Sequence, residues 1–294
     1  MSSGEIAAAR SGGAWESVPG VPGPSLRPFV AWYSGYRQAG VPPATHRGLP
    51  SPYLTLIITL DDPLDLAVPT DPGRAPGRYR TLLGGLHTTP AIIRHDGRQS
   101  GIQLGLRPLG ARVLLGLPAG ALHGVDTDAA DVLGPVAVEL YERVRAASTW
   151  AGRFAVLDEV LLRQLREDQP VSPEVGRAWR VLLSSGGTAA VPELAGQAGW
   201  SSRRLSTRFR SELGLGPKEA ARVVRFDRAR RLLQRRVSAG GPAELAALAA
   251  SCGYYDQAHL AREFRMLAGV PPSRWIAEEF RNVQVPRPPG LPEL

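Results

Sequence analysis

Two stretches near the C-terminus repeat each other, and this repeat constrains the fold more than any other feature of the chain. The first covers residues 192–217, PELAGQAGWSSRRLSTRFRSELGLGP, and the second covers residues 243–272, AELAALAASCGYYDQAHLAREFRMLAGVPP. Each copy holds an apolar anchor, a small residue, a turn glycine and two core residues in the same order, which is the pattern of a helix-turn-helix. These residues are Leu194, Ala195, Gly199, Leu205 and Phe209 in the first copy, and Leu248, Ala249, Gly253, Leu260 and Phe264 in the second, whose turn is one residue longer.

Proline and glycine mark the ends of the first helix in each copy. Pro192 and Pro242 suit a first helical position, where the missing N–H is unpaired in any case. Gly199 and Gly253 suit a left-handed C-cap. In the second helix of each copy, apolar residues fall at helical spacing and leave the opposite face polar. The apolar stripes hold Leu205, Phe209, Leu213 and Leu260, Phe264, Leu267; the polar faces hold Arg203, Ser206, Thr207, Arg210 and Gln257, Ala258, Ala261, Arg262, Arg265.

The positive charge of the chain lies in the same part of the sequence as the repeat. Residues 1–170 hold 16 basic and 16 acidic side chains, whereas residues 171–294 hold 19 basic and 11 acidic ones, a net charge of +8. A basic domain attached to a neutral one is typical of a nucleic-acid binder, because neutralisation of phosphates supplies most of the sequence-independent affinity. The polar faces also suit bases, since Arg and Gln can make two hydrogen bonds to guanine and adenine.

The region from about residue 173 to residue 281 resembles the DNA-binding domain of the AraC/XylS family of bacterial transcription regulators. The family joins two helix-turn-helix units by a long helix, and residues 218–236, KEAARVVRFDRARRLLQRR, match that connector. GYYDQAHLAREFRMLAGVPPSRW is similar to the most characteristic stretch of the family. Position 207 departs from the family, because it is commonly Arg there and is Thr in this chain.

The resemblance implies which side chains touch DNA. The base-contact candidates are Arg203, Ser206, Thr207, Gln257, Ala258 and Arg262, and the phosphate candidates are Arg204, Arg208, Arg210, His259 and Arg265. The arginines of the connector, Arg228, Arg230, Arg231, Arg235 and Arg236, are expected to form ion pairs or solvated surface instead. We therefore predict a sequence-specific transcription regulator that sets two recognition helices into adjacent major grooves of double-stranded DNA.

The N-terminal half reads as a β-rich domain. Residues 29–36, 53–60, 64–68, 79–83, 90–95 and 102–106 have strand patterns separated by Pro and Gly turns, which favours a small barrel or sandwich. Residues 110–117, 132–145 and 150–166 are predicted helices. The predicted fold class is α+β, with a β-rich domain (cupin-like or a small barrel) and its helical appendage at residues 27–166, and an all-α domain at residues 174–281. Residues 1–26 are predicted to lack fixed structure, residues 167–173 to be a linker, and residues 282–294 to be a Pro-rich tail.

In this family the first domain often senses a small molecule or dimerises the protein, so the resemblance implies a small-molecule effector and a homodimer. RNA polymerase is a further partner if the protein is an activator. Aromatic and histidine side chains that could line an effector pocket are Trp32, Tyr36, His46, His87 and His95, although aromatic residues in strands are more often part of a core. No His-x-His pair followed by Glu is present, so we predict neither a metal nor another cofactor.

Two alternative functions would need chemistry that the sequence does not offer. A cupin-type enzyme fused to a DNA-binding domain needs a metal triad or an acid/base pair in residues 27–130. A DNA-repair methyl acceptor needs a reactive cysteine in its own segment, yet Cys252 lies inside the second repeat, at a position that suits burial between helices. We therefore predict no enzymatic activity. The sequence has no uninterrupted apolar run of about 18 residues and no signal-peptide pattern, which predicts a cytoplasmic, nucleoid-associated protein.

Overall fold

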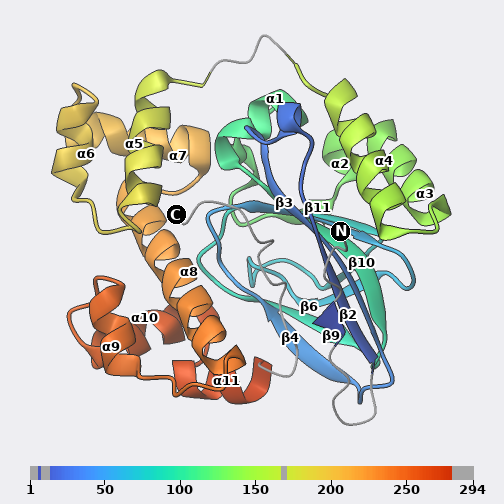
Figure 1. Cartoon of the computed structure of the whole chain (residues 1–294). Coiled ribbons are helices and arrows are strands. Elements are labelled where there is room, and N and C mark those ends of the chain that lie inside the picture. The colour runs from blue at the N-terminus through green and yellow to red at the C-terminus, as the bar shows by residue number, and fades with distance from the viewer. Residues whose placement is uncertain (1–5, 8–13, 167–170, 280–294) are drawn as a thin grey trace.

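The computed structural model describes residues 6–7, 14–166 and 171–279. Figure 1 shows a β-rich N-terminal part beside a helical C-terminal part, so the fold class is α+β, as predicted. The predicted tail and residues 167–170 of the predicted linker lie outside the described residues. The division of the chain into domains at residues 167–173 therefore stays a prediction.

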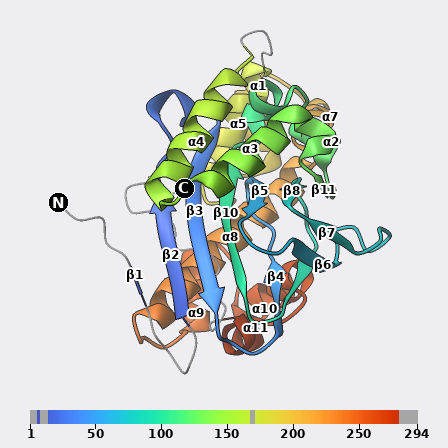
Figure 2. The same ribbon diagram turned by 90° about the vertical axis from the view of Figure 1, so that its right-hand side faces the viewer.

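Antiparallel strands form two sheets in the N-terminal part (Figure 2). The larger sheet has the strand order β1-β2-β3-β10-β5-β8-β11, and the smaller sheet has the order β4-β9-β6-β7. The strands of the larger sheet are β1 (Ile6–Ala7), β2 (Ala14–Gly20), β3 (Val30–Ala39), β10 (Gln99–Leu106), β5 (Leu54–Thr59), β8 (Thr81–Gly84) and β11 (Asp126–Asp128). Those of the smaller sheet are β4 (Ala44–Gly48), β9 (Ala91–His95), β6 (Leu64–Val68) and β7 (Gly77–Tyr79).

Strand β5 of the larger sheet, which lies between β10 and β8, is buried on both of its faces. Leu56 and Ile58 pack in the core that the larger sheet shares with the helices of the N-terminal part. Ile57 points to the other side and packs with Leu66 and Ile93 of the smaller sheet. The apolar run of this strand therefore reflects a layer on each side of it.

The structure of the N-terminal part differs from the sequence predictions in several places. Residues 14–20 form strand β2, whose backbone pairs with β3, and Pro24–Leu26 form a short 3-10 helix (η1) that buries Leu26, so the expected lack of structure does not hold for residues 14–26. The single strand predicted at residues 79–83 is two strands, because the chain passes from the smaller to the larger sheet at Arg80. Strands β4 and β11 were not predicted, since neither has an alternating apolar pattern.

Two helices cover the outer face of the larger sheet. They are α3 (Pro135–Ala146) and α4 (Trp150–Arg163), which follow the short helix α2 (Ala130–Leu133). The predicted helix at residues 132–145 is interrupted at Gly134, whose φ of +58° is left-handed. A Cβ at Gly35 of β3 would lie 2.4 Å from the Trp150 ring, so only glycine allows the helix to pack this closely.

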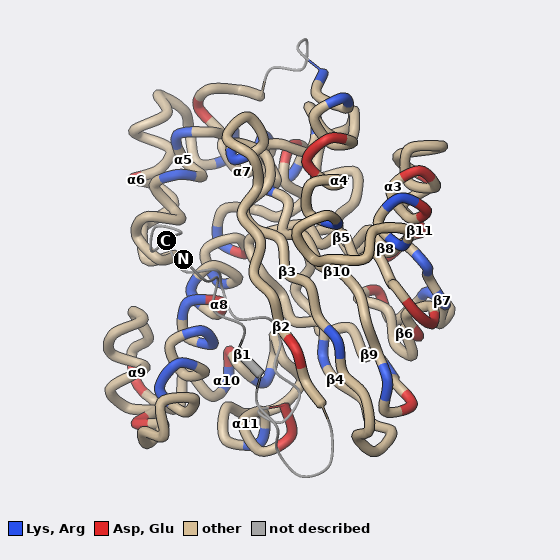
Figure 3. The backbone as a smooth tube through the Cα atoms, turned by 45° about the vertical axis from the view of Figure 1, so that its right-hand side comes forward, with Lys and Arg blue, Asp and Glu red and all other residues tan. Residues whose placement is uncertain are grey.

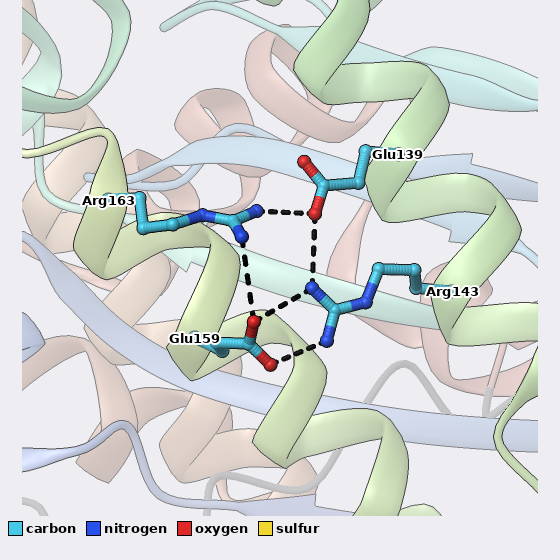
Figure 4. A network of polar contacts seen from close by, with 4 residues as sticks. All are labelled: Glu139, Arg143, Glu159 and Arg163. Carbon is cyan, nitrogen blue, oxygen red and sulfur yellow. Dashed lines mark hydrogen bonds and ion pairs between the residues drawn. The ribbon is translucent and has the colours of Figure 1, made fainter.

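Charged side chains join α3 to α4 at the surface (Figure 4). Arg143 of α3 donates to Glu159 of α4 at 2.9 Å and to Glu139 of its own helix at 3.0 Å, and Arg163 donates to Glu139. Together the four side chains form a closed network that links the surfaces of the two helices.

The C-terminal part consists of helices around one apolar core. They are α5 (Pro173–Ser184), α6 (Val191–Gln197), α7 (Ser202–Leu213), α8 (Pro217–Ser238), α9 (Leu245–Ser251), α10 (Gln257–Ala268) and α11 (Pro272–Glu279). Helix α8 crosses between the α6–α7 pair and the α9–α10 pair (Figure 1). Leu86 of the N-terminal part is fully buried in this same core, so the two parts of the chain share apolar contacts. Between β10 and α2, the short helices η2 (Pro108–Gly110), α1 (Ala111–Leu115) and η3 (Ala119–Leu122) connect the sheet to α7.

Candidate nucleic-acid interface

The first unit, α6 and α7, has the predicted helix-turn-helix geometry. Gly199 ends α6 with a φ of +67°, which is the left-handed conformation expected of its C-cap. The Ser201 hydroxyl caps α7 by accepting a hydrogen bond from the Arg204 N–H at 3.2 Å. Leu205, Phe209 and Leu213 are fully buried, so the predicted apolar stripe of α7 is confirmed.

The second unit, α9 and α10, repeats this arrangement with stronger capping. Gly253 has a φ of +74°, and the Asp256 carboxylate accepts the His259 N–H at 2.6 Å. Phe264 of α10 meets the Phe226 ring of α8 edge to face at 4.9 Å between centroids. Two helix starts differ from the prediction, since Pro192 is the second residue of α6. Helix α9 begins at Leu245 after Glu244, whose φ is +41°, so Pro242 lies before the helix and not at its first position.

The base-contact candidates of α7 lie on its accessible side. Arg203 and Thr207 are exposed, Ser206 is half-buried, and Arg203 has no ion pair with any described residue. The hydroxyls of Ser206 and Thr207 donate to the backbone carbonyls of Ser202 and Arg203, at 2.8 and 3.1 Å. Their hydrogens are therefore used within the helix, and their outward lone pairs can accept a hydrogen bond from a base.

The base-contact candidates of α10 are Gln257, Ala258 and Arg262, and all three are exposed. The side chains of Gln257 and Arg262 make no hydrogen bond or ion pair with another described residue. The side chains on this face are therefore free to bond a ligand without first breaking a contact within the protein.

The phosphate candidates are exposed except for His259. Arg204, Arg208, Arg210 and Arg265 are all exposed, and Arg204 lies over the Trp200 ring at 4.8 Å. His259 is half-buried, and its Nδ1 accepts the Tyr255 N–H at 3.3 Å, so only its Nε2 can reach a phosphate. Next to α7 a groove of about 320 Å³ is lined by Ser201, Arg203, Arg204, Thr207 and Arg208. Three guanidinium groups around one hollow suit an anionic oxygen.

The arginines of α8 are largely engaged with carboxylates, as predicted for this helix, which Figure 3 shows with a high density of basic residues. Asp227 is buried and contacts both Arg230, at 2.8 Å, and Arg231. Burial opposes ionisation of this carboxyl, but Arg231 and Arg230 outweigh it and hold the pKa of Asp227 below its usual value. Sequence reasoning missed a second pair, in which Arg222 of α8 donates to the buried Glu263 of α10 at 2.7 Å. This pair ties the connector to the second recognition helix.

A cavity of about 680 Å³ opens at one end of the two N-terminal sheets. Tyr36 and His95 line it, and His46 lies beside His95 with 5.9 Å between ring centroids. Burial, together with the nearby His95, lowers the pKa of His46 to about 4, so its ring is neutral at pH 7. The other two residues of the predicted pocket lie elsewhere, because Trp32 packs against Gly105 and His87 bonds to the Thr89 carbonyl at 2.6 Å.

The described residues contain no group of three or more His, Cys, Asp and Glu side chains arranged to hold a metal ion. Within the same residues no helix has the length and apolar character needed to cross a membrane. Cys252 is a buried free thiol beside the turn of the second unit, as the sequence indicated.

Comparison with known proteins gives two family matches. A model described as a helix-turn-helix domain matches residues 194–278, and a model described as a domain of unknown function (DUF6597) matches residues 20–128. No curated protein matches the chain.

Among solved structures, the chain is similar to ToxT from Vibrio cholerae. One ToxT crystal structure has 11% identity and a TM-score of 0.49, with 84% of this chain and 97% of that chain covered. A second, of wild-type ToxT bound to an unsaturated fatty acid, has 10% identity and a TM-score of 0.46, with 81% and 92% covered.

The helix-turn-helix match covers both units and the connector between them, from Leu194 on α6 to Glu278 on α11. Within those bounds the chain has the duplicated turn geometry, the two exposed polar faces and the long joining helix that the sequence resemblance implied. The C-terminal part therefore carries a double helix-turn-helix domain of the AraC type, and the chain is a DNA-binding transcription regulator.

Proposed function

We propose that α7 and α10 enter two successive major grooves on one side of the DNA, with α8 fixing the distance between them. The observation that carries this proposal is the connector. Helix α8 has 22 residues, and at about 1.5 Å per residue it is roughly 33 Å long. Half-sites that are one helical turn apart are separated by about 34–36 Å. The two units also pack on one core, so the connector can hold them as a single reading surface.

Within this arrangement the exposed side chains divide into two roles. Arg203, Ser206 and Thr207 read one half-site, and Gln257, Ala258 and Arg262 read the other, because these residues lie on the accessible faces of the two recognition helices. Arg204, Arg208, Arg210, His259 and Arg265 flank those faces and bind phosphates. In the first half-site Arg203 contributes most of the base discrimination, since Ser206 and Thr207 offer only acceptor lone pairs.

The cavity in the N-terminal part is the proposed site of a small-molecule effector that modulates DNA binding. It is supported by its size, which lies within the usual range of about 300–1,000 Å³ for ligand pockets, and by the presence of Tyr36 and His95 in its wall. Homodimer formation and contact with RNA polymerase remain family-based predictions.

Selection from a random duplex library by the full-length protein at near-physiological salt tests the DNA-reading proposal. We expect enrichment of a bipartite sequence whose two parts lie about 10 base pairs apart. Repeating the selection with Arg262→Ala should lose the preference in one part only, whereas Arg180→Ala, an exposed arginine of α5, is the control for loss of one charge. A single uninterrupted motif, or an unchanged motif with Arg262→Ala, would contradict the placement of the second helix.

A further inference from the structure

Strand β4 of the smaller sheet touches two distant parts of the molecule. Ala44, at its start, lines the cavity and is paired with His95 of β9. Arg47, three residues later, pairs with Ile92, so its side chain belongs to the opposite face of the sheet. There it meets α11, the helix that follows the second recognition helix.

The contact between Arg47 and α11 is short and largely shielded from water. Arg47 lies 2.7 Å from Oε1 of Glu279 through one guanidinium nitrogen, and 2.8 Å from Oε2 of Glu278 through another. The backbone N–H of Arg47 also donates to Glu279 at 3.1 Å. The Glu279 side chain is 2% exposed, so this carboxylate depends on Arg47 for compensation of its charge.

Helix α11 is in turn packed on the recognition helix. Trp275 of α11 is buried, and its ring lies 5.8 Å from that of Phe264 in α10. A displacement of α11 therefore reaches α10 through a contact between two large buried side chains.

The first unit is held to the N-terminal part at another place. Arg112 of α1 makes two hydrogen bonds to Glu212 at the end of α7, at 2.8 and 3.0 Å. Gly120 of η3 also lies against the last turn of α7, where a Cβ would be 2.5 Å from the Ser211 carbonyl oxygen. Since β4 is absent from this contact, a change in β4 should affect the second unit selectively.

We propose that strand β4 couples the cavity to the second helix-turn-helix unit, with Arg47 as the positioning residue that holds α11. The regulatory meaning rests on the proposed function of the cavity as an effector site. An occupant that shifts the Ala44 end of β4 changes the position of Arg47, and the Glu279 and Trp275 contacts pass that change to α10. The coupling itself is a property of the free protein and can be measured without DNA or effector.

The test is hydrogen exchange of the full-length protein and of variants at Arg47, Arg274 and Ala44. Arg47→Ala should speed exchange of the α10 and α11 amides by about tenfold or more and leave α7 unchanged, because only the second unit loses its ion pairs with β4. Arg47→Lys keeps the charge and should restore most of the protection. Arg274→Ala is the matched control, since Arg274 is 66% exposed and pairs with Glu278 within α11 without touching β4. It should change α11 exchange less than about threefold.

Ala44→Phe then partly fills the cavity in place of an occupant. We expect it to change α11 exchange by about threefold or more in the parent protein and to have no effect in the Arg47→Ala background, which is the signature of a coupled pair. Ala44→Val is the milder replacement if the N-terminal amides show that Ala44→Phe disturbs the sheet. Equal effects in both backgrounds, or unchanged α11 exchange with either replacement, would overturn the coupling. Selection of a bipartite DNA motif would stand independently of that result.

Discussion

Asp227→Asn should destabilise the C-terminal helices by about 3 kcal/mol, and the reason is the burial of the charge that it removes. The Asp227 carboxylate is 1% exposed and sits between Arg230 and Arg231, which are 13% and 18% exposed. Asparagine keeps the shape but leaves two largely buried guanidinium groups without a counter-charge. Breaking a buried pair from one side costs roughly 3–5 kcal/mol, and the amide oxygen can still accept one hydrogen bond, which favours the lower end of that range.

Thermal unfolding followed by circular dichroism at pH 7 measures this effect. For a unit of about 100 residues, a loss of about 3 kcal/mol lowers the midpoint by roughly 10 °C or more. Asp62→Asn is the matched control, since this aspartate is 67% exposed and lies 4.0 Å from Arg98, and it should cost less than about 0.5 kcal/mol.

The dependence on pH sharpens the test. The pKa of Asp227 is lowered in the folded protein, so its stabilising contribution is complete above the unfolded pKa and is lost as the pH falls through the folded pKa. The two proteins should therefore converge in acid. A difference below about 1 kcal/mol at pH 7, or one that grows on acidification, would refute the reasoning.

Three further predictions concern the recognition helices and the cavity. Arg262→Ala should weaken binding to the selected sequence by about 1–3 kcal/mol and change little the binding to sequences altered at the contacted base. Arg208→Ala should weaken binding to all sequences and lower the slope of log affinity against log salt concentration by about 0.9. Binding titrations at several salt concentrations separate the two effects. Asp256→Ala removes the cap of α10 and should lower stability in urea by about 1 kcal/mol, and an unchanged midpoint would show that the cap contributes nothing. Burial and His95 lower the pKa of His46 to about 4, so the stability that depends on its neutral ring is complete above the unfolded pKa and falls by about 2 kcal/mol at pH 5. His46→Leu should remove that part of the loss of stability in acid. Identical profiles of stability against pH for the two proteins would contradict this prediction.

The C-terminal units could be predicted from the sequence because their signals are local. A turn glycine such as Gly199, a cap such as Ser201 and an apolar stripe at helical spacing all act within a few residues of the helix that they define. The connector was predicted at residues 218–236 and extends over Pro217–Ser238 for the same reason. The start of α6 differs by one residue, since Val191 precedes Pro192 in the helix, and the start of α9 was misplaced, since Pro242 suggested a first turn that the chain does not form.

The parts that escaped prediction depend on residues far apart in the chain. Strand β4 has no alternating apolar pattern and is defined by its pairing with β9. Its Arg47 contacts Glu279, which is 232 residues later in the sequence. The aromatic and histidine residues proposed for a pocket come together only in part, because the two sheets bring Tyr36 and His95 together and leave Trp32 and His87 elsewhere. Residue type indicates which contacts a side chain can make, but the pairing of distant strands decides which side chains line the same cavity.

The free energies of the contacts within the C-terminal part indicate where a regulated change in this molecule can occur. The two units are joined by a core that includes Phe209, Phe226 and Phe264, all fully buried, and removal of one such ring typically costs about 3–5 kcal/mol. Separating the units along α8 would break several of these contacts at once, which exceeds what the differential binding of a small effector, typically 1–3 kcal/mol, can supply. The ion pairs at the ends, Arg112 with Glu212 and Arg47 with Glu279, are fewer and lie outside this set of rings. We therefore expect an effector to turn the rigid pair of units, or loosen one of its ends, rather than to change the spacing between them.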